Sequence, residues 1–224
     1  MAAGVIMDTR HRQSALVRQP AYWQQACDHL MQRDRILRKL IPVYGHEAIQ
    51  ARQSPFQTLI RIIVGQQISL TLGRTLWARL VQACGHDMQP GCIAQFTEAE
   101  LRAFGLSLRK AQYLRDAAAF FAESDRLDPA WWDTHDDAAV MSLLCDIRGV
   151  GRWTAEMFLI FFLGRPDVLP LDDTALLKAI SHHYFSGEPV SRFEAREVSQ
   201  AWAPWRTVAS WYLWRSMDAA AVEY

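Results

Sequence analysis

Apolar residues recur at helical spacing through nearly the whole of this chain, which leaves little room for a fold built on strands. The connections between the apolar stretches are short and carry helix-start signals instead of hairpin signals. Ser54 offers an N-cap, followed by Pro55 at the first helical position and by Gln57 three residues after the cap. Segments 97–100 and 191–194 repeat the capping-box pattern. We therefore predict an all-α protein.

The spacing predicts helices over residues 21–40, 55–65, 70–84, 97–103, 108–122, 136–145, 151–163, 173–184, 191–202 and 205–218. No strand is predicted. Segment 124–135 contains Pro129, two tryptophans and several acidic residues, so we expect a loop there. Residues 1–19 are polar and unpatterned, and we expect them to form a flexible tail.

The chain has 224 residues, of which 50% are hydrophobic, and it can bury a core in one domain or in two small interleaved ones. Charges break its apolar runs well short of a bilayer crossing. Polar, arginine-bearing residues stand where a signal peptide would need its apolar stretch. We expect a soluble cytoplasmic protein without membrane partners, associated with the nucleoid if its source is bacterial.

The four cysteines are Cys27, Cys84, Cys92 and Cys145. They show no CxxC spacing and no neighbouring histidine at ligand distance. The sequence therefore predicts neither a zinc site nor an iron–sulfur cluster, and we expect the four residues to be reduced thiols.

Lysine and arginine together number 24, as do aspartate and glutamate, so the formal net charge is zero. This balance argues against binding DNA mainly through a global positive field, and any DNA-binding charge must be local. The candidate basic residues for such a surface are Arg61, Arg74, Arg109, Lys110, Arg148, Arg152 and Lys178. Solvation of helix faces is an equally ordinary use for surface arginines.

A glycine hairpin is the first motif that points to a ligand. Gly149 and Gly151 flank Val150 between two apolar helical stretches, as suits a turn that bends sharply and approaches another molecule. The helix that we expect to begin at Gly151 has free first amides, which together with the helix dipole make a site for a phosphate oxygen. Such a contact reads the DNA backbone and not its base sequence. A helix C-cap glycine followed by a new helix is the alternative interpretation.

A pair of carboxylates, Asp172 and Asp173, opens the helix predicted next along the chain. An aspartate just before an apolar-periodic helix is most often an N-cap, and this alternative is strong for Asp172 and open for Asp173. A fixed carboxylate also stabilises the oxocarbenium-like transition state that develops when a glycosidic bond breaks, and it can orient the attacking water. The residues alone leave both interpretations open.

Together these motifs resemble the helix-hairpin-helix and the Gly/Pro-rich loop with aspartate of the DNA glycosylase superfamily, in its 3-methyladenine DNA glycosylase II branch. The segments that carry the resemblance are 147–155, 169–173, 63–69, 101–106 and 202–206, with Trp214 beyond them. The resemblance implies two helical subdomains with the active cleft between them. Residues 54–163 would form the central bundle with the hairpin, and residues 20–53 plus 164–224 would form the second subdomain.

The resemblance also implies an activity. It makes Asp173 the catalytic residue of a DNA glycosylase that flips alkylated purines, such as 3-methyladenine or 7-methylguanine, out of duplex DNA and hydrolyses the N-glycosidic bond. Relatives that also nick the backbone carry a Schiff-base lysine directly after the position of Arg152, where this chain has Trp153, so we expect no lyase activity. The alternatives are a glycosylase of the same fold for oxidised or deaminated bases and a noncatalytic DNA-binding module.

The remaining site residues are implied in the same way. The resemblance assigns the base pocket to Trp153, Trp214, Met157 and Thr174, the last two standing where the family has tyrosines. Electron-rich indole faces suit a cationic base. Gln67 falls on the position that wedges into the DNA stack. The residues expected at the DNA backbone are Gly149, Gly151, Arg152 and Thr154.

The hairpin of the family holds a monovalent cation through main-chain carbonyls, which here would be those of Cys145, Ile147 and Val150. We expect Na⁺ or K⁺ at that place and no other cofactor. The expected partner is double-stranded DNA containing damaged bases, bound by a monomer.

Overall fold

The structure is a computed structural model, and it describes residues 20–45, 48–49, 54–85 and 88–217. The tail predicted at residues 1–19 lies outside the described residues. The described chain is all helical, as predicted, and contains no strand. Its elements are α1 (Trp23–Arg33), α2 (Leu37–Tyr44), α3 (Pro55–Gly65), α4 (Leu70–Ala83), α5 (Pro90–Gln95), α6 (Glu98–Ala103), α7 (Leu108–Phe120), η1 (Ser124–Leu127), α8 (Pro129–Asp133), α9 (Asp137–Cys145), α10 (Arg152–Phe161), α11 (Thr174–Tyr184), α12 (Arg192–Ser199), η2 (Gln200–Trp202) and α13 (Arg206–Met217).

The helix starts predicted from capping residues are confirmed. The Ser54 hydroxyl accepts the Gln57 amide at the start of α3, which has proline at its first position. Thr97 and Ser191 form complete capping boxes at α6 and α12. In these places local side-chain chemistry is enough to fix where a helix begins.

Two predictions about helices were wrong. The helix expected over 21–40 is broken at Asp34, whose Oδ1 accepts the amides of Ile36 and Leu37 and starts α2 as a separate helix. The loop expected over 124–135 contains η1 and α8, and α8 begins at Pro129 after Asp128 caps it. Proline at the first turn needs no amide partner, so it favours the start of a short helix as readily as a loop.

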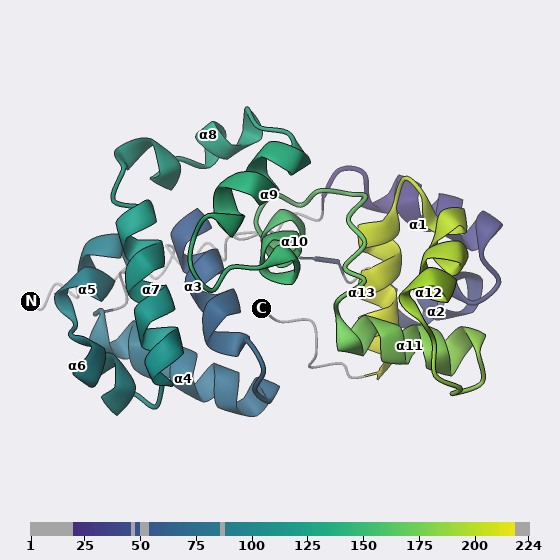
Figure 1. The fold of residues 1–224 in the computed structure, drawn as a ribbon. Coiled ribbons are helices and arrows are strands. Elements are labelled where there is room, and N and C mark those ends of the chain that lie inside the picture. The colour runs from purple at the N-terminus through teal and green to yellow at the C-terminus, as the bar shows by residue number, and fades with distance from the viewer. Residues whose placement is uncertain (1–19, 46–47, 50–53, 86–87, 218–224) are drawn as a thin grey trace, which may run out of the picture.

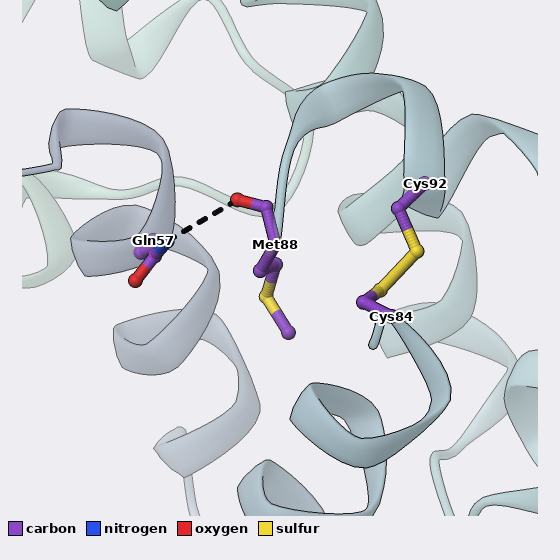
Figure 2. The surroundings of a disulfide bond; sticks show 4 residues. All are labelled: Gln57, Cys84, Met88 and Cys92. Carbon is purple, nitrogen blue, oxygen red and sulfur yellow. Dashed lines mark hydrogen bonds between the residues drawn. A yellow bond between two sulfur atoms is a disulfide. The ribbon is translucent and has the colours of Figure 1, made fainter. Parts of the chain in front are cut away.

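The expectation of four reduced cysteines was also wrong. Cys84 and Cys92 form a disulfide that joins the end of α4 to α5, with their Cα atoms 5.8 Å apart (Figure 2). Beside it, Gln57 Nε2 donates to the Met88 carbonyl at 3.4 Å and ties α3 to the same connection. Cys27 and Cys145 are free thiols.

The described helices pack in two groups (Figure 1). In the first group α3 packs against α4, α7 and α10, with α5 and α6 on α7 and α9 on α10. In the second group α13 packs against α1, α2 and α11. Trp132 and Phe158 are fully buried in the first group, and Trp23, Trp202 and Tyr212 are fully buried in the second. No helix in the described ranges is long and apolar enough to cross a bilayer.

Candidate active site

A cavity of about 800 Å³ lies between residues of the two helix groups. The loop after α3 and the first turns of α7 form one side of it, over residues 65–69 and 107–113. The hairpin between α9 and α10 and the start of α11 form the other side, over residues 149–154 and 172–175. Its volume is in the range of ordinary ligand sites.

Asp173 lies in the wall of this cavity with only 7% of its surface exposed. Its Oδ1 accepts the Leu176 amide at 2.7 Å and the Trp214 indole N–H at 2.9 Å. Its Oδ2 accepts the Trp153 indole N–H at 2.9 Å. Three donors from three helices therefore fix one carboxylate, which stays in contact with the cavity.

Contacts with α13 hold the loop before α11 in place, and with it Asp173. Thr207, at the start of α13, donates its hydroxyl to the Arg165 carbonyl and accepts the Val168 amide. Arg206 pairs with Asp167 at 3.3 Å. The same loop closes on itself, because the Asp173 amide donates to the Pro170 carbonyl.

The two neighbouring aspartates have separate roles. Asp173 is the N-cap of α11 and also faces the cavity, so the two interpretations of the sequence do not exclude each other. Asp172 does not cap the helix, which corrects the alternative offered for it. Its carboxylate is exposed and pairs with Arg192 at 2.7 Å.

The glycine hairpin has the geometry that its sequence suggests. Gly149 has φ +87°, and a Cβ added there would overlap the ring of Tyr113 on α7. Gly151 is exposed and is the N-cap of α10, where it has no side chain to satisfy the first amides of the helix. Those amides, Thr154 among them, begin beside the cavity. The hairpin therefore presents helix-start N–H groups in the way that anion sites require.

Two arginines of the hairpin are held in ion pairs. Arg148 Nε donates to Asp116 on α7 at 2.7 Å, and this carboxylate raises the pKa of the guanidinium. Arg152 Nε donates to Glu156 Oε1 at 2.8 Å, and 69% of its side chain is exposed.

The structure separates the four residues assigned to the base pocket. Trp153 and Thr174 line the cavity. Trp214 lies behind the Asp173 carboxylate and is 4% exposed, and Met157 is completely buried one helical turn beyond Trp153. Neither of these two lines the cavity, so their contact with a base stays a prediction.

The residue predicted to be the wedge stands at the cavity on the loop between α3 and α4. Gln67 is exposed and has φ +54°, a left-handed conformation that is uncommon for a residue other than glycine. Its neighbour Gln66 turns inward: Nε2 donates to the Gly149 carbonyl at 3.1 Å and to the Thr154 hydroxyl at 2.8 Å. Sequence analysis missed this role, because polar neighbours in a loop carry no signal of which one turns inward.

Of the candidate basic residues, Arg109 and Lys110 line the cavity. Lys110 Nζ donates to the Val64 carbonyl near the end of α3 at 2.7 Å, and burial lowers the pKa of this lysine. Arg61 and Arg74 line a smaller hollow of about 90 Å³ beside the wedge loop. Four of the seven candidate basic residues thus line the cavity or the hollow beside the wedge loop.

A buried carboxylate that sequence analysis missed lies on α10. Glu156 is 2% exposed, and its Oε2 has no hydrogen-bond partner among the described residues. Burial raises the pKa of Glu156 to about 6, against the opposing effect of Arg152. It is three residues after Trp153, but it is not part of the cavity wall.

The three hairpin carbonyls predicted to hold a cation differ in whether they accept a backbone hydrogen bond. The Ile147 carbonyl accepts the Val150 amide at 3.0 Å. Within the described residues, no backbone hydrogen bond of the turn ends on the carbonyl of Cys145 or Val150. Neutral carbonyl oxygens suit Na⁺ or K⁺, so this set fits a monovalent cation. No group of His, Cys, Asp or Glu in the described ranges could hold a metal ion.

An all-helical fold with a glycine hairpin, a capping aspartate and a cavity between them defines a helix-hairpin-helix protein of the DNA glycosylase type. A family model described as "HhH-GPD superfamily base excision DNA repair protein" matches residues 60–204. The chain belongs to this superfamily.

Three similar proteins place it more closely. The solved Schizosaccharomyces pombe 3-methyladenine DNA glycosylase Mag1, in complex with abasic DNA, has TM-score 0.80 and 26% identity, covering 89% of this chain and 100% of that one. A Bacillus halodurans DNA-3-methyladenine glycosidase structure has TM-score 0.72 and 33% identity, covering 89% and 92%. A Bacillus subtilis relative, YfjP, provisionally named a DNA-3-methyladenine glycosylase, is 33% identical over 172 residues. That match covers 74% of this chain and 60% of the relative.

Proposed function

We propose that this protein is a monofunctional DNA glycosylase that hydrolyses the N-glycosidic bond of alkylated purines in duplex DNA. The observation that carries the proposal is the Asp173 carboxylate, 7% exposed and held by two indole N–H groups and a backbone amide in the wall of the cavity. The names of the relatives support 3-methyladenine as a substrate. We propose 7-methylguanine as a second substrate, because alkylation gives that base a positive charge too.

In the proposed reaction Asp173 acts on the sugar. As the bond to the base breaks, positive charge develops on the deoxyribose, and a fixed carboxylate nearby stabilises that charge. Because three donors already hold Asp173, little reorganisation is needed when the charge forms. The same carboxylate orients the water that attacks the anomeric carbon.

The leaving base needs no general acid when alkylation has already given it a positive charge. The face of Trp153, in the cavity wall, would contact such a base and favour it over the neutral parent. Thr174 is the second residue of this wall assigned to the base. Trp214 would act by holding Asp173, and Met157 by packing behind Trp153.

The DNA is held by its backbone and opened by a wedge. The amides at the start of α10, with Gly151, Arg152 and Thr154, would bind a phosphate beside the flipped nucleotide. Gln67 would fill the gap that the base leaves in the stack. A Na⁺ or K⁺ ion on the carbonyls of Cys145, Ile147 and Val150 would add positive charge near that phosphate.

The proposal extends to the whole molecule. We propose that it acts as a monomer in the cytoplasm, on nucleoid DNA if the source is bacterial. We also propose that residues 54–163 form one subdomain and residues 20–53 plus 164–224 the other.

Release of methylated bases from duplex DNA tests the function. The wild-type protein should release 3-methyladenine from methylated DNA, and Asp173→Asn should lose release by a factor of about 100 or more, because the charge that stabilises the transition state is gone. Asp172→Asn is the matched control. That carboxylate also borders the cavity, but it is exposed and pairs with Arg192, so this variant should retain most of the activity. Equal release by the wild type and Asp173→Asn would remove Asp173 from the mechanism.

Borohydride trapping tests the absence of lyase activity. Trp153 offers no amine, so borohydride should trap no covalent complex between the protein and DNA that it has acted on. The cavity does contain one amine, Lys110, which is hydrogen-bonded to the Val64 carbonyl. A trapped complex would contradict the proposal, and its loss in Lys110→Met would identify the nucleophile.

A further inference from the structure

The wedge loop is tied to the hairpin by the side chain of Gln66. Gln66 Nε2 donates both to the Gly149 carbonyl and to the Thr154 hydroxyl, so one amide group bridges the two elements. Both acceptors belong to the segment that presents the phosphate-binding amides. Gln66 itself is half-buried, and Thr154 is 2% exposed.

The wedge loop needs this contact with the hairpin because its own backbone is strained at Gln67. Gln67 has φ +54°, where a side chain with a Cβ is disfavoured, so a free loop would tend to leave this conformation. On the helix side, Lys110 holds the Val64 carbonyl at the end of α3. The exposed Gln67 is therefore the only residue of the Gln66-Gln67 pair left free to enter a duplex, and it projects from a point fixed on both sides.

We propose that Gln66 is a positioning residue, which locks the wedge loop onto the hairpin so that Gln67 enters the stack at the nucleotide whose phosphate the hairpin holds. Flipping requires the two events at the same step of the strand, because a wedge displaced by one nucleotide would fill no gap. This inference rests on the proposed function and adds a coupling between its two DNA contacts.

The test replaces the amide by a side chain of similar shape. Gln66→Met removes both donated hydrogen bonds, and base release from 7-methylguanine paired with cytosine should fall about tenfold in kcat. With the same lesion opposite an abasic analogue, where no base pair has to open, the loss should be about threefold or less. Gln57→Met is the matched control, because it removes a Gln hydrogen bond to the Met88 carbonyl at the other end of α3. It should not change base release.

Three results would overturn the proposal. If Gln66→Met lowers activity equally on the paired and the unpaired lesion, or if Gln57→Met lowers it as much, the role of Gln66 is only structural. Unchanged activity of Gln66→Met overturns it as well. Should Gln66→Met fail to fold, Thr154→Val removes one of the two acceptors and should show the same preference for the unpaired lesion.

A binding measurement separates this inference from the proposed function. A duplex with 2-aminopurine beside an abasic analogue reports insertion of the wedge without any chemistry. The fluorescence change on binding should be smaller for Gln66→Met than for the wild type and Gln57→Met. If the wild type releases no base, the proposed function fails, and an equal fluorescence change in all three proteins would still overturn the positioning role.

Discussion

Two buried aspartates of this protein are bound by similar sets of donors, and Asp173 also lies in the wall of the 800 Å³ cavity. Asp34 caps α2 through two backbone amides, and its Oδ2 accepts the Tyr184 hydroxyl and the Trp202 indole N–H. Asp173 caps α11 and accepts two indole N–H groups. Buried carboxylates need such partners wherever they stand, so hydrogen bonding alone does not mark a catalytic residue. The place of Asp173 in the wall of this cavity, beside the hairpin, is the feature that points to catalysis.

The double role of Asp173 predicts that stability and activity respond differently to two substitutions. Asp173→Asn keeps an oxygen for the cap and for Trp214, whereas Asp173→Ala leaves the Leu176 amide and both indoles without an acceptor. We expect Asp173→Ala to be less stable than Asp173→Asn by about 2 kcal/mol, although both lose base release. Urea unfolding followed by fluorescence measures the difference, and equal stability would contradict the capping role.

Glu156 predicts a pH dependence of stability. Burial raises the pKa of Glu156 from its ordinary 4.5 to about 6, so the folded state binds the proton more tightly than the unfolded chain does. This tighter proton binding adds about 2 kcal/mol to the free energy of unfolding. The added stability is fully present below about pH 4.5 and is lost as the pH rises through about 6.

In Glu156→Gln this titration is absent. The free energy of unfolding of this variant, relative to the wild type, should rise by about 1 kcal/mol between about pH 5 and about pH 7.5. Urea unfolding at several pH values measures the change, and any constant offset from the substitution cancels. A difference that stays flat with pH would show that Glu156 titrates normally.

At the scale of the element, the two glycines of the hairpin should behave differently. In Gly149→Ala the new Cβ would overlap the Tyr113 ring, and φ +87° is strained for alanine. We therefore expect the free energy of unfolding to fall by about 3 kcal/mol and DNA binding to be lost. At Gly151 the backbone is extended and no atom lies near a new Cβ. Gly151→Ala should therefore lose less than about 1 kcal/mol of stability.

Gly151→Ala should nevertheless weaken DNA binding, because its methyl group would stand where the phosphate approaches the helix start. Thermal unfolding and binding to a duplex with an abasic analogue measure the two effects separately. If Gly151→Ala bound DNA as tightly as the wild type, the phosphate would not bind at the start of α10.

Elements whose ends are set by local chemistry could be predicted from the sequence, and elements set by distant contacts could not. The caps at Ser54, Thr97 and Ser191 were recognised because cap and partner lie within one turn. The break at Asp34 depends in part on Tyr184 and Trp202, which are distant in the sequence. The disulfide, whose partners are separated by eight residues without a CxxC spacing, had no comparable local cue.

The candidate site divides in the same manner. The hairpin and Asp173 could be proposed from the sequence because each stands in a short segment, 147–155 and 169–173, that resembles a family motif. The bridge from Gln66 to Gly149 and Thr154 spans more than eighty residues, and no spacing rule predicts it. The burial of Glu156 was not predicted either, because a glutamate on a helix is ordinarily solvent-exposed and only the packing around α10 buries this one.

At the scale of the whole molecule, zero net charge limits how DNA can be held. A neutral protein gains no long-range attraction from its total charge, so affinity for undamaged DNA must come from a few local contacts. Arg109 and Lys110 in the cavity wall, with Arg61 and Arg74 in the neighbouring hollow, place that charge on the face that carries the wedge. The dependence of affinity on salt counts such contacts, because each neutralised phosphate releases its counterions.

Arg109 provides the test of this local field. In Arg109→Gln the slope of log affinity against log salt concentration should become shallower by about one, whatever the DNA sequence, since one phosphate contact is lost. Arg33→Gln is the matched control, because Arg33 is equally exposed but lies in the last turn of α1, in the other helix group. Fluorescence anisotropy with an undamaged duplex over a salt series measures both slopes. If both variants changed the slope equally, the protein would bind DNA through its overall charge, and the cavity face would have no special part in holding the strand.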